Sequence, residues 1–148
     1  MTFPFVQENT ESRHRLESLV RGLSDEDLAC STDYGWTVAA LLAHLAFWDQ
    51  RMFAILRRWK EDGFDESPID SLAVNNALKV ICHALAPRTA AELSISAAEQ
   101  IDAELATLTP DFVKQIEEHV EATSTQFRMN RALHRNDHLK DIEALLKR

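Results

Sequence analysis

Two histidines near the C-terminal end of the chain have a spacing that suits metal binding. His134 and His138 lie four residues apart in the stretch ALHRNDHLKDIEALL, so on a helix their side chains share one face, one turn apart. Ile142 and Leu145 continue that face, which indicates that it points into the protein. Imidazoles at this spacing can converge on one metal ion, although such a pair also arises by chance.

A third histidine lies inside an apolar run. His44 is the polar residue of VAALLAHLAFW, which starts at Val38 and ends at Trp48. A buried imidazole without a partner costs about 1–3 kcal/mol, so it requires a hydrogen bond or a metal ion. For His44 alone, a hydrogen-bonded core histidine is the simpler interpretation. Together with the inward-facing pair, His44 predicts a three-histidine site inside a helical bundle.

Three neutral imidazoles without a fourth protein ligand describe an open metal site. Structural zinc normally has four protein ligands, whereas catalytic zinc keeps one position for water or substrate. Asp141 shares the face of His134 and His138, and two interpretations of it stay open. Either it accepts the second ring N–H of a metal-bound histidine, or it is an ordinary solvated acid near the helix end. Imidazole ligation suits zinc, nickel, copper or iron(II).

Other side chains are candidates for the walls of a pocket at this site. Trp48 lies one turn past His44, and Arg51 follows His44 by seven residues, so both share its side of the helix. The alternative for each is an ordinary structural role. The same two interpretations apply to three polar residues elsewhere in the chain, namely Tyr34, Asn75 and Asn76.

Several familiar catalytic motifs are absent from the sequence. HRNDH lacks the glutamate that follows the first histidine of the HExxH peptidase motif. The phosphate-binding patterns GxxxxGK and GxGxxG do not occur. Cys82 and His83 are adjacent, so on a helix they point about 100° apart and form no nucleophile–base pair.

The composition indicates what kind of protein must position these residues. The chain has 148 residues, which fits a single domain over residues 1–148, and its three Gly and four Pro are few. A net charge of −8 makes nucleic acid and anionic membranes poor partners. No apolar run approaches the roughly 20 residues that cross a bilayer, and the first residues do not look like a signal peptide. With Cys30 and Cys82 isolated, these features predict a reduced, cytoplasmic protein.

Hydrophobic periodicity predicts an all-α, four-helix bundle with one or two short accessory helices. The long helices are expected from near Gln7 to Arg21, from a cap at Thr37 to about Lys60, from a capping box at Thr89–Glu92 to about Leu108, and from about Ser124 to the C-terminus. Ser24 can cap a short turn. Pro68 to Pro87 carries a further helical pattern, and Thr109 with Pro110 starts a short helix. The long stretch after the second helix could cross from one end of the bundle to the other.

The sequence resembles the DinB-like (damage-inducible) family of four-helix-bundle metalloproteins over most of its length. The resemblance rests on GWTVAALLAHLAFWD and LHRNDHLKDIEALL. In that family a helix that follows Gly-Trp-Thr or Gly-Trp-Ser carries one metal-binding histidine, which falls here on His44. A later HxxxH helix supplies the other two, which fall on His134 and His138. The family often has glutamine where this chain has Asp141.

The resemblance implies a fold and a group of activities. It implies a bundle with up–down–down–up connectivity, often a homodimer, that holds zinc, nickel or another divalent ion. Relatives include thiol-dependent S-transferases and isomerases that use mycothiol or bacillithiol, and hydrolase-like resistance proteins. We therefore expect a metal-dependent enzyme that activates a thiol or a water molecule for a small-molecule substrate. The alternative is a non-enzymatic bundle that binds a metal or small ligand.

Overall fold

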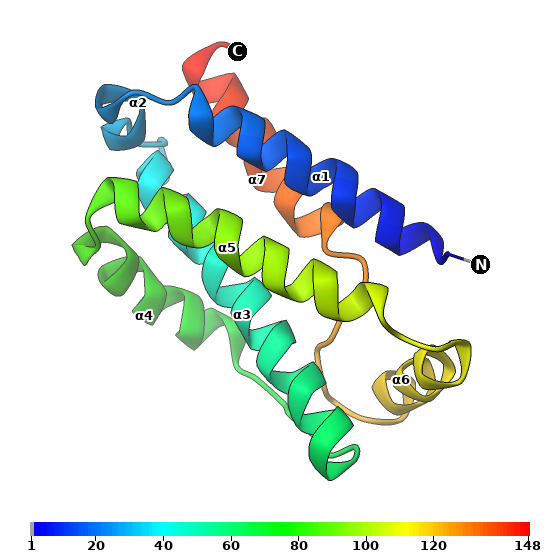
Figure 1. Ribbon diagram of the computed structural model, residues 1–148. Coiled ribbons are helices and arrows are strands. Elements are labelled where there is room, and N and C mark those ends of the chain that lie inside the picture. Colours follow the sequence, from blue (N-terminus) through cyan, green and yellow to red (C-terminus); the bar gives the residue numbers. More distant parts are fainter. Residues whose placement is uncertain (1) are drawn as a thin grey trace.

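All regular elements in residues 2–148, the part of the chain that the computed structural model describes, are helices (Figure 1). In chain order they are α1 (Pro4–Arg21), α2 (Asp25–Ala29), α3 (Val38–Asp62), α4 (Ser71–Ala84), α5 (Pro87–Ala106), α6 (Pro110–Ala122) and α7 (Ala132–Leu146). The predicted all-α fold class is confirmed. The four longest helices are accompanied by α2, α4 and α6, one accessory helix more than the sequence predicted. No helix in the described range is long and apolar enough to span a lipid bilayer.

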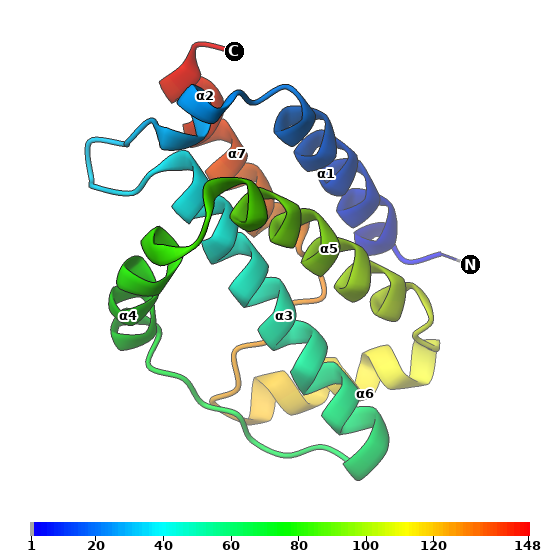
Figure 2. The same ribbon diagram turned by 60° about the vertical axis from the view of Figure 1, so that its left-hand side comes forward.

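The long helices lie in two neighbouring pairs (Figures 1 and 2). α3 and α5 lie side by side and run in the same direction. α1 and α7 also lie side by side and both run the opposite way. α5 additionally packs against α1, so the two pairs share one interior.

The parallel arrangement of α3 and α5 requires a connection that returns along the bundle. α3 ends at Asp62, and the next residue, Gly63, has a φ of 89° that is readily adopted only by glycine. An irregular segment, residues 64–70, and then α4 carry the chain back toward the first turns of α3, where α5 begins (Figure 2). This return matches the crossing that the long stretch between the second and third long helices suggested.

The apolar core has two parts, arranged along α3. Around its first half, residues such as Leu42 pack with Leu16 of α1 and Leu139 of α7. Around its second half, Leu56 packs with residues of α5 and α6, including Ile116. The first half of α3 is buried nearly all round, as its apolar sequence predicted.

Three helices begin with side-chain caps that the sequence predicts. In each case the side-chain oxygen accepts a hydrogen bond from the backbone N–H three residues later: Asp27 for Ser24 before α2, Ala40 for Thr37 before α3, and Phe112 for Thr109 before α6. Such a bond satisfies one of the N–H groups that a helix leaves free at its start, and it stabilises the helix by about 1 kcal/mol.

Two other helices begin at a proline and earlier than expected. α1 begins at Pro4, and the start near Gln7 is wrong. α5 begins at Pro87, and the capping box expected at Thr89 is wrong because Thr89 already lies inside the helix. Proline is favoured in the first turn, since its fixed φ suits the helix and its missing N–H would have no partner there.

The start of α7 shows the largest difference from the sequence-based expectation. The helix begins at Ala132 rather than near Ser124, and residues 123–131 form an irregular segment. The side-chain oxygen of Asn9 in α1 accepts hydrogen bonds from the backbone N–H groups of Arg131 and Ala132, at 2.7 and 3.1 Å. A contact with a distant helix therefore determines where α7 begins.

Candidate metal centre

His44 is held by the most buried part of α3. Residues 38–46 are all buried, and His44 itself is 8% exposed. Its ring meets Trp36 and Trp48 edge to face, with centroids 5.5 and 6.4 Å apart. The Trp48 indole N–H donates a hydrogen bond of 3.1 Å to the side-chain oxygen of Asn75. This bond connects the surroundings of His44 to α4.

The first half of α7 presents His134 and His138 toward α3. The two rings lie edge to face with centroids 4.9 Å apart. The centroid of the His44 ring is 5.2 Å from that of His134 and 4.8 Å from that of His138. The structure thus brings together the three histidines that the sequence singled out.

The ring nitrogens are close enough to share an ion. Nε2 of His44 lies 3.2 Å from Nε2 of His134, and one nitrogen from each of the three rings lies within 4.8 Å of the others. Two imidazole nitrogens bound at about 2.1 Å to one tetrahedral zinc ion lie about 3.4 Å apart. The observed 3.2 Å suits two ligands of one ion and equally suits a hydrogen bond between two neutral rings. The group could therefore hold a metal ion.

Two ring nitrogens at this site lack a hydrogen-bond partner. Nδ1 of His44 and Nδ1 of His138 are buried and contact no donor or acceptor within residues 2–148. Buried polar atoms in proteins are nearly always bonded. An ion bound by Nε2 of His44 would still leave Nδ1 of that ring without a partner, so the fit to a metal rests on the convergence of the three rings. Three nitrogen donors suit a divalent transition-metal ion, and the residues present fit one.

Burial keeps the imidazoles neutral. Desolvation is the main cause that lowers the pKa of His44 from 6.5 to about 4 and that of His134 to about 2. Desolvation also lowers the pKa of His138, and the negative charge of Asp141 opposes that shift. Neutral imidazole is the form that binds metals, so near pH 7 these rings need lose no proton to do so.

A buried ion-pair network fixes α7 against α3 and α5. Arg135 is fully buried, and its guanidinium donates hydrogen bonds to Asp49 of α3 at 3.1 Å and to Asp102 of α5 at 2.7 Å. Arg131 donates from Nε to the other carboxylate oxygen of Asp49 at 2.8 Å. Because Arg131 directly precedes α7, and Arg135 lies on α7 with two of the histidines, the network sets the position of those histidines relative to α3.

This network is not evident from the sequence patterns described above. Its signals were Asp49, which directly follows the apolar run of α3, and Arg135, which stands between the two histidines of α7. A charged residue next to buried neighbours on a helix is itself a candidate for burial with a partner. The partners lie on three different helices, so spacing along the chain does not identify them.

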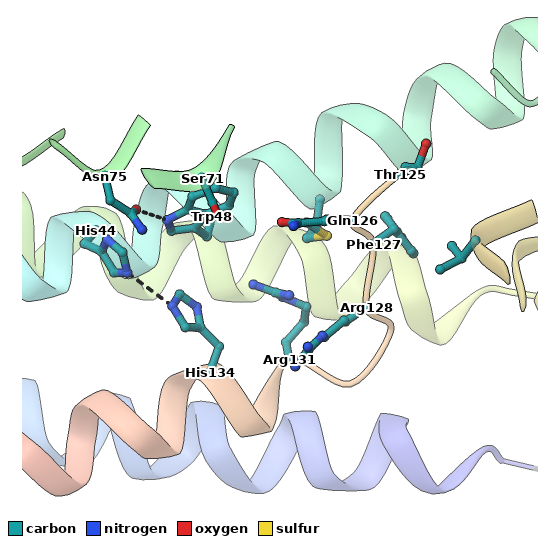
Figure 3. Close-up of a pocket in the computed structure, with 12 residues that line it drawn as sticks. His44, Trp48, Ser71, Asn75, Thr125, Gln126, Phe127, Arg128, Arg131 and His134 are labelled. Atoms are coloured by element: carbon teal, nitrogen blue, oxygen red, sulfur yellow. Dashed lines mark hydrogen bonds between the residues drawn. The ribbon is translucent and has the colours of Figure 1, made fainter. Parts of the chain in front are cut away.

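A cavity of about 450 Å³ lies beside two of the histidines (Figure 3). His44 and His134 line it, whereas His138 does not. The remaining walls come from α3, α4, α6 and the segment that precedes α7: Trp48, Met52, Ser71, Asn75, Val120, Thr125, Gln126, Phe127, Arg128 and Arg131. The volume suits a small molecule. His44 and His134, two of the residues that would hold an ion, therefore border this space.

Arg51 and Asp141 lie elsewhere. Arg51 does not line the cavity; its guanidinium donates hydrogen bonds to the backbone carbonyls of Ser67 at 2.8 Å and Gln126 at 2.7 Å. It thereby joins the two irregular segments beside the cavity. The Asp141 carboxylate accepts a hydrogen bond of 3.3 Å from the Tyr34 hydroxyl, and within the described chain no histidine ring nitrogen donates to it.

These features define an all-helical protein with a cluster of three neutral imidazoles, two of which line a cavity. The family model of the DinB superfamily matches residues 8–141. The chain therefore belongs to the DinB superfamily. Searches of curated proteins and of solved structures found no match.

Proposed function

We propose that this chain is a metal-dependent enzyme that binds one divalent ion through His44, His134 and His138. The observation that carries the proposal is the cluster itself: three neutral imidazoles, that of His44 buried and those of His134 and His138 half-buried, with nitrogens within 4.8 Å of one another. Its membership of the DinB superfamily supports the same interpretation. Zinc and nickel are the ions that we favour, because imidazole ligands suit both.

Each part of the site has a role in this proposal. The three histidines hold the ion, and the Arg135 network keeps α7 at the distance from α3 that this requires. The cavity beside His44 and His134 has room for a small substrate, and both polar and apolar side chains line it. A divalent ion at this position lowers the pKa of a bound thiol or water and supplies a nucleophile at neutral pH.

We favour a thiol over water as the activated group. The reaction would then be S-transfer from a low-molecular-weight thiol to an electrophile, as in the thiol-dependent relatives that the sequence resembles. With water in the same position, the reaction would be hydrolysis.

A specific observation favours a second candidate, a non-enzymatic protein that binds a metal or small ligand. Apart from His44 and His134, the residues that line the cavity include no group that readily takes a proton near pH 7. A site without a separate general base is compatible with binding alone. Turnover distinguishes the two candidates.

We further propose that the four long helices form one bundle domain with up–down–down–up connectivity. The opposite directions of the α1–α7 and α3–α5 pairs support this, as does the return of the chain through α4 (Figure 1). A homodimer, a cytoplasmic location and the absence of nucleic-acid binding stay predictions.

The proposal is tested first by metal content and then by turnover. Untagged protein should contain about one divalent ion per chain, and a crystal should give anomalous signal between the three histidines. The metal-loaded protein should accelerate the reaction of a small thiol with a generic alkylating electrophile, and chelation should remove the acceleration. Tight metal binding without any acceleration would favour the binding protein. Failure to bind a divalent ion would contradict the metal-dependent enzyme and would leave a protein that binds a small ligand without a metal.

A further inference from the structure

Two arginines on one side of the cavity are available to bind an anion. Arg131 is 4% exposed, and its only side-chain hydrogen bond within residues 2–148 runs from Nε to Asp49. Its two terminal Nη nitrogens have no partner there, although they carry four N–H groups. Arg128 lines the same cavity and makes no hydrogen bond or ion pair within the described chain. Figure 3 shows both side chains near His134.

The cavity is cationic although the chain is acidic. The net charge of the chain is −8, yet the lining residues include two arginines and neither aspartate nor glutamate. Asp49 and Asp102, which do not line the cavity, form ion pairs with Arg131 and Arg135 and balance their charges. Arg128 remains unbalanced, and three neutral imidazoles would leave the full charge of a divalent ion in place. The local field therefore favours a negatively charged ligand.

The geometry of Arg131 favours a carboxylate in particular. Because Nε is engaged by Asp49, the end of the guanidinium with its two Nη nitrogens is left for a ligand. That end presents parallel N–H groups that match the two oxygens of a carboxylate. Burial of the arginine strengthens such a bond and holds the guanidinium in one orientation.

We propose that the cavity binds a small organic carboxylate, whose carboxylate group accepts hydrogen bonds from Arg131 and Arg128 while its other end reaches the side of the histidine cluster that His44 and His134 present to the cavity. The contact between the ligand and a metal ion at the histidines rests on the proposed function. The contact between the carboxylate and the two arginines does not. The inference adds the chemical class of the substrate, a small anion, to the reaction proposed above. The cavity of about 450 Å³ limits the ligand to a compact molecule.

The first experiment compares thiols of different charge on cobalt-loaded protein. The probes are 3-mercaptopropionate, 2-mercaptoethanol and cysteamine, which are anionic, neutral and cationic at the end remote from sulfur. Visible absorption of the cobalt site reports binding. We expect 3-mercaptopropionate to bind about tenfold more tightly than 2-mercaptoethanol, which corresponds to one charge-assisted hydrogen-bonded contact, and cysteamine to bind most weakly.

Matched variants assign the preference to the arginines. Arg128→Gln removes a side chain without bonds in the described chain, so it should fold normally and reduce the preference for 3-mercaptopropionate at least threefold. Arg131→Gln should remove most of it. Arg57→Gln removes the same charge from an exposed position of α3 and should leave the preference unchanged. Equal affinities for the three thiols in the wild type would overturn the proposal.

The second experiment omits the metal, so that it does not depend on thiol binding. Metal-free protein is titrated with glutarate and with its neutral diamide, and the indole N–H signal of Trp48 is followed by NMR. We expect glutarate to shift this signal in the wild type but not in Arg131→Gln, and the diamide to have no effect. If no thiol perturbs cobalt but glutarate binds in this way, the thiol reaction is wrong and the carboxylate site stands. If glutarate and the diamide behave alike, the carboxylate site is wrong.

Discussion

The burial of His44 makes a sharp prediction for a single substitution. His44→Ala should abolish tight metal binding, because the two remaining imidazoles lie on one helix and do not enclose an ion. The variant should stay folded, since alanine suits a helix interior and the change removes a polar atom without a partner. Calorimetric titration with zinc measures the first effect, and circular dichroism the second.

His14 provides the control, because it is exposed on α1 and belongs to no cluster. His14→Ala should bind the ion as the wild type does. Unchanged affinity in His44→Ala would show that the three imidazoles do not act together.

The lowered pKa values of the histidines predict how the stability of metal-free protein depends on pH. In the unfolded chain these groups titrate near 6.5, whereas in the fold His44 titrates at about 4 and His134 at about 2. Between these values the unfolded chain binds more protons, so the free energy of unfolding falls as the pH drops below about 6.5. The contribution of His44 is lost by about pH 4, and that of His134 continues to fall toward pH 2.

Urea unfolding of chelator-treated protein between about pH 7.5 and about pH 4.5 checks this dependence. The decline should be less steep in His44→Ala, which lacks one of the groups. Equal slopes for wild type and variant would mean that the burial of His44 does not shift its titration.

At the scale of helices, the ion pairs between α7, α3 and α5 predict a large loss of stability on mutation. Arg135→Ala leaves Asp49 and Asp102 buried with their negative charges less compensated, which should reduce the free energy of unfolding by about 3–5 kcal/mol. Urea unfolding measures this change. Arg57→Ala breaks an exposed pair with Glu61 on α3 and should change stability by less than about 0.5 kcal/mol. Similar losses in the two variants would contradict the burial of the network.

The starts of α3 and α5 predict that two threonine substitutions will differ in their effect on the stability of the protein. Thr37 caps α3, so Thr37→Ala should destabilise the protein by about 1 kcal/mol. Thr89 lies inside α5 without a capping role, so Thr89→Ala should be neutral or slightly stabilising, because alanine is the better helix former. Thermal unfolding of both variants tests the pair. A loss of about 1 kcal/mol in Thr89→Ala would support the capping box that the sequence suggested.

These helices show which local features can be predicted from sequence. The caps at Ser24, Thr37 and Thr109 depend on neighbouring residues, so their side chains identify them. The start of α7 depends on Asn9, which is more than a hundred residues away in sequence and bonds the backbone at Arg131. Periodicity carries no information about such a contact, and the predicted helix was accordingly too long.

At the scale of the whole molecule, the candidate site was easier to predict than the space beside it. The three histidines have a distinctive residue type, spacing and apolar surroundings. The cavity is enclosed by α3, α4, α6 and the segment that precedes α7, and its shape depends on how these pack. Arg128 and Arg131 gain their significance only from this packing, so the sequence alone did not single them out.

Metal binding should stabilise the entire fold, because the three ligands connect α3 with α7. An ion that binds only the folded chain adds about 2.7 kcal/mol when its free concentration is a hundred times the dissociation constant. For a chain of this length the melting temperature should rise by about 5–10 °C. Differential scanning calorimetry with and without zinc measures the shift. His44→Ala should show none, and an equal shift in that variant would place the bound ion elsewhere.

The segment from 123 to 131 separates two properties that evolution could change independently. Its five cavity-lining residues differ in burial: Thr125, Phe127 and Arg131 are buried and also anchor the segment, whereas Gln126 and Arg128 are exposed. Replacements at the two exposed positions would alter what the cavity accepts without repacking the bundle or moving the histidines. A lineage with this architecture could keep the three histidines while it diversified the molecules that the cavity accepts.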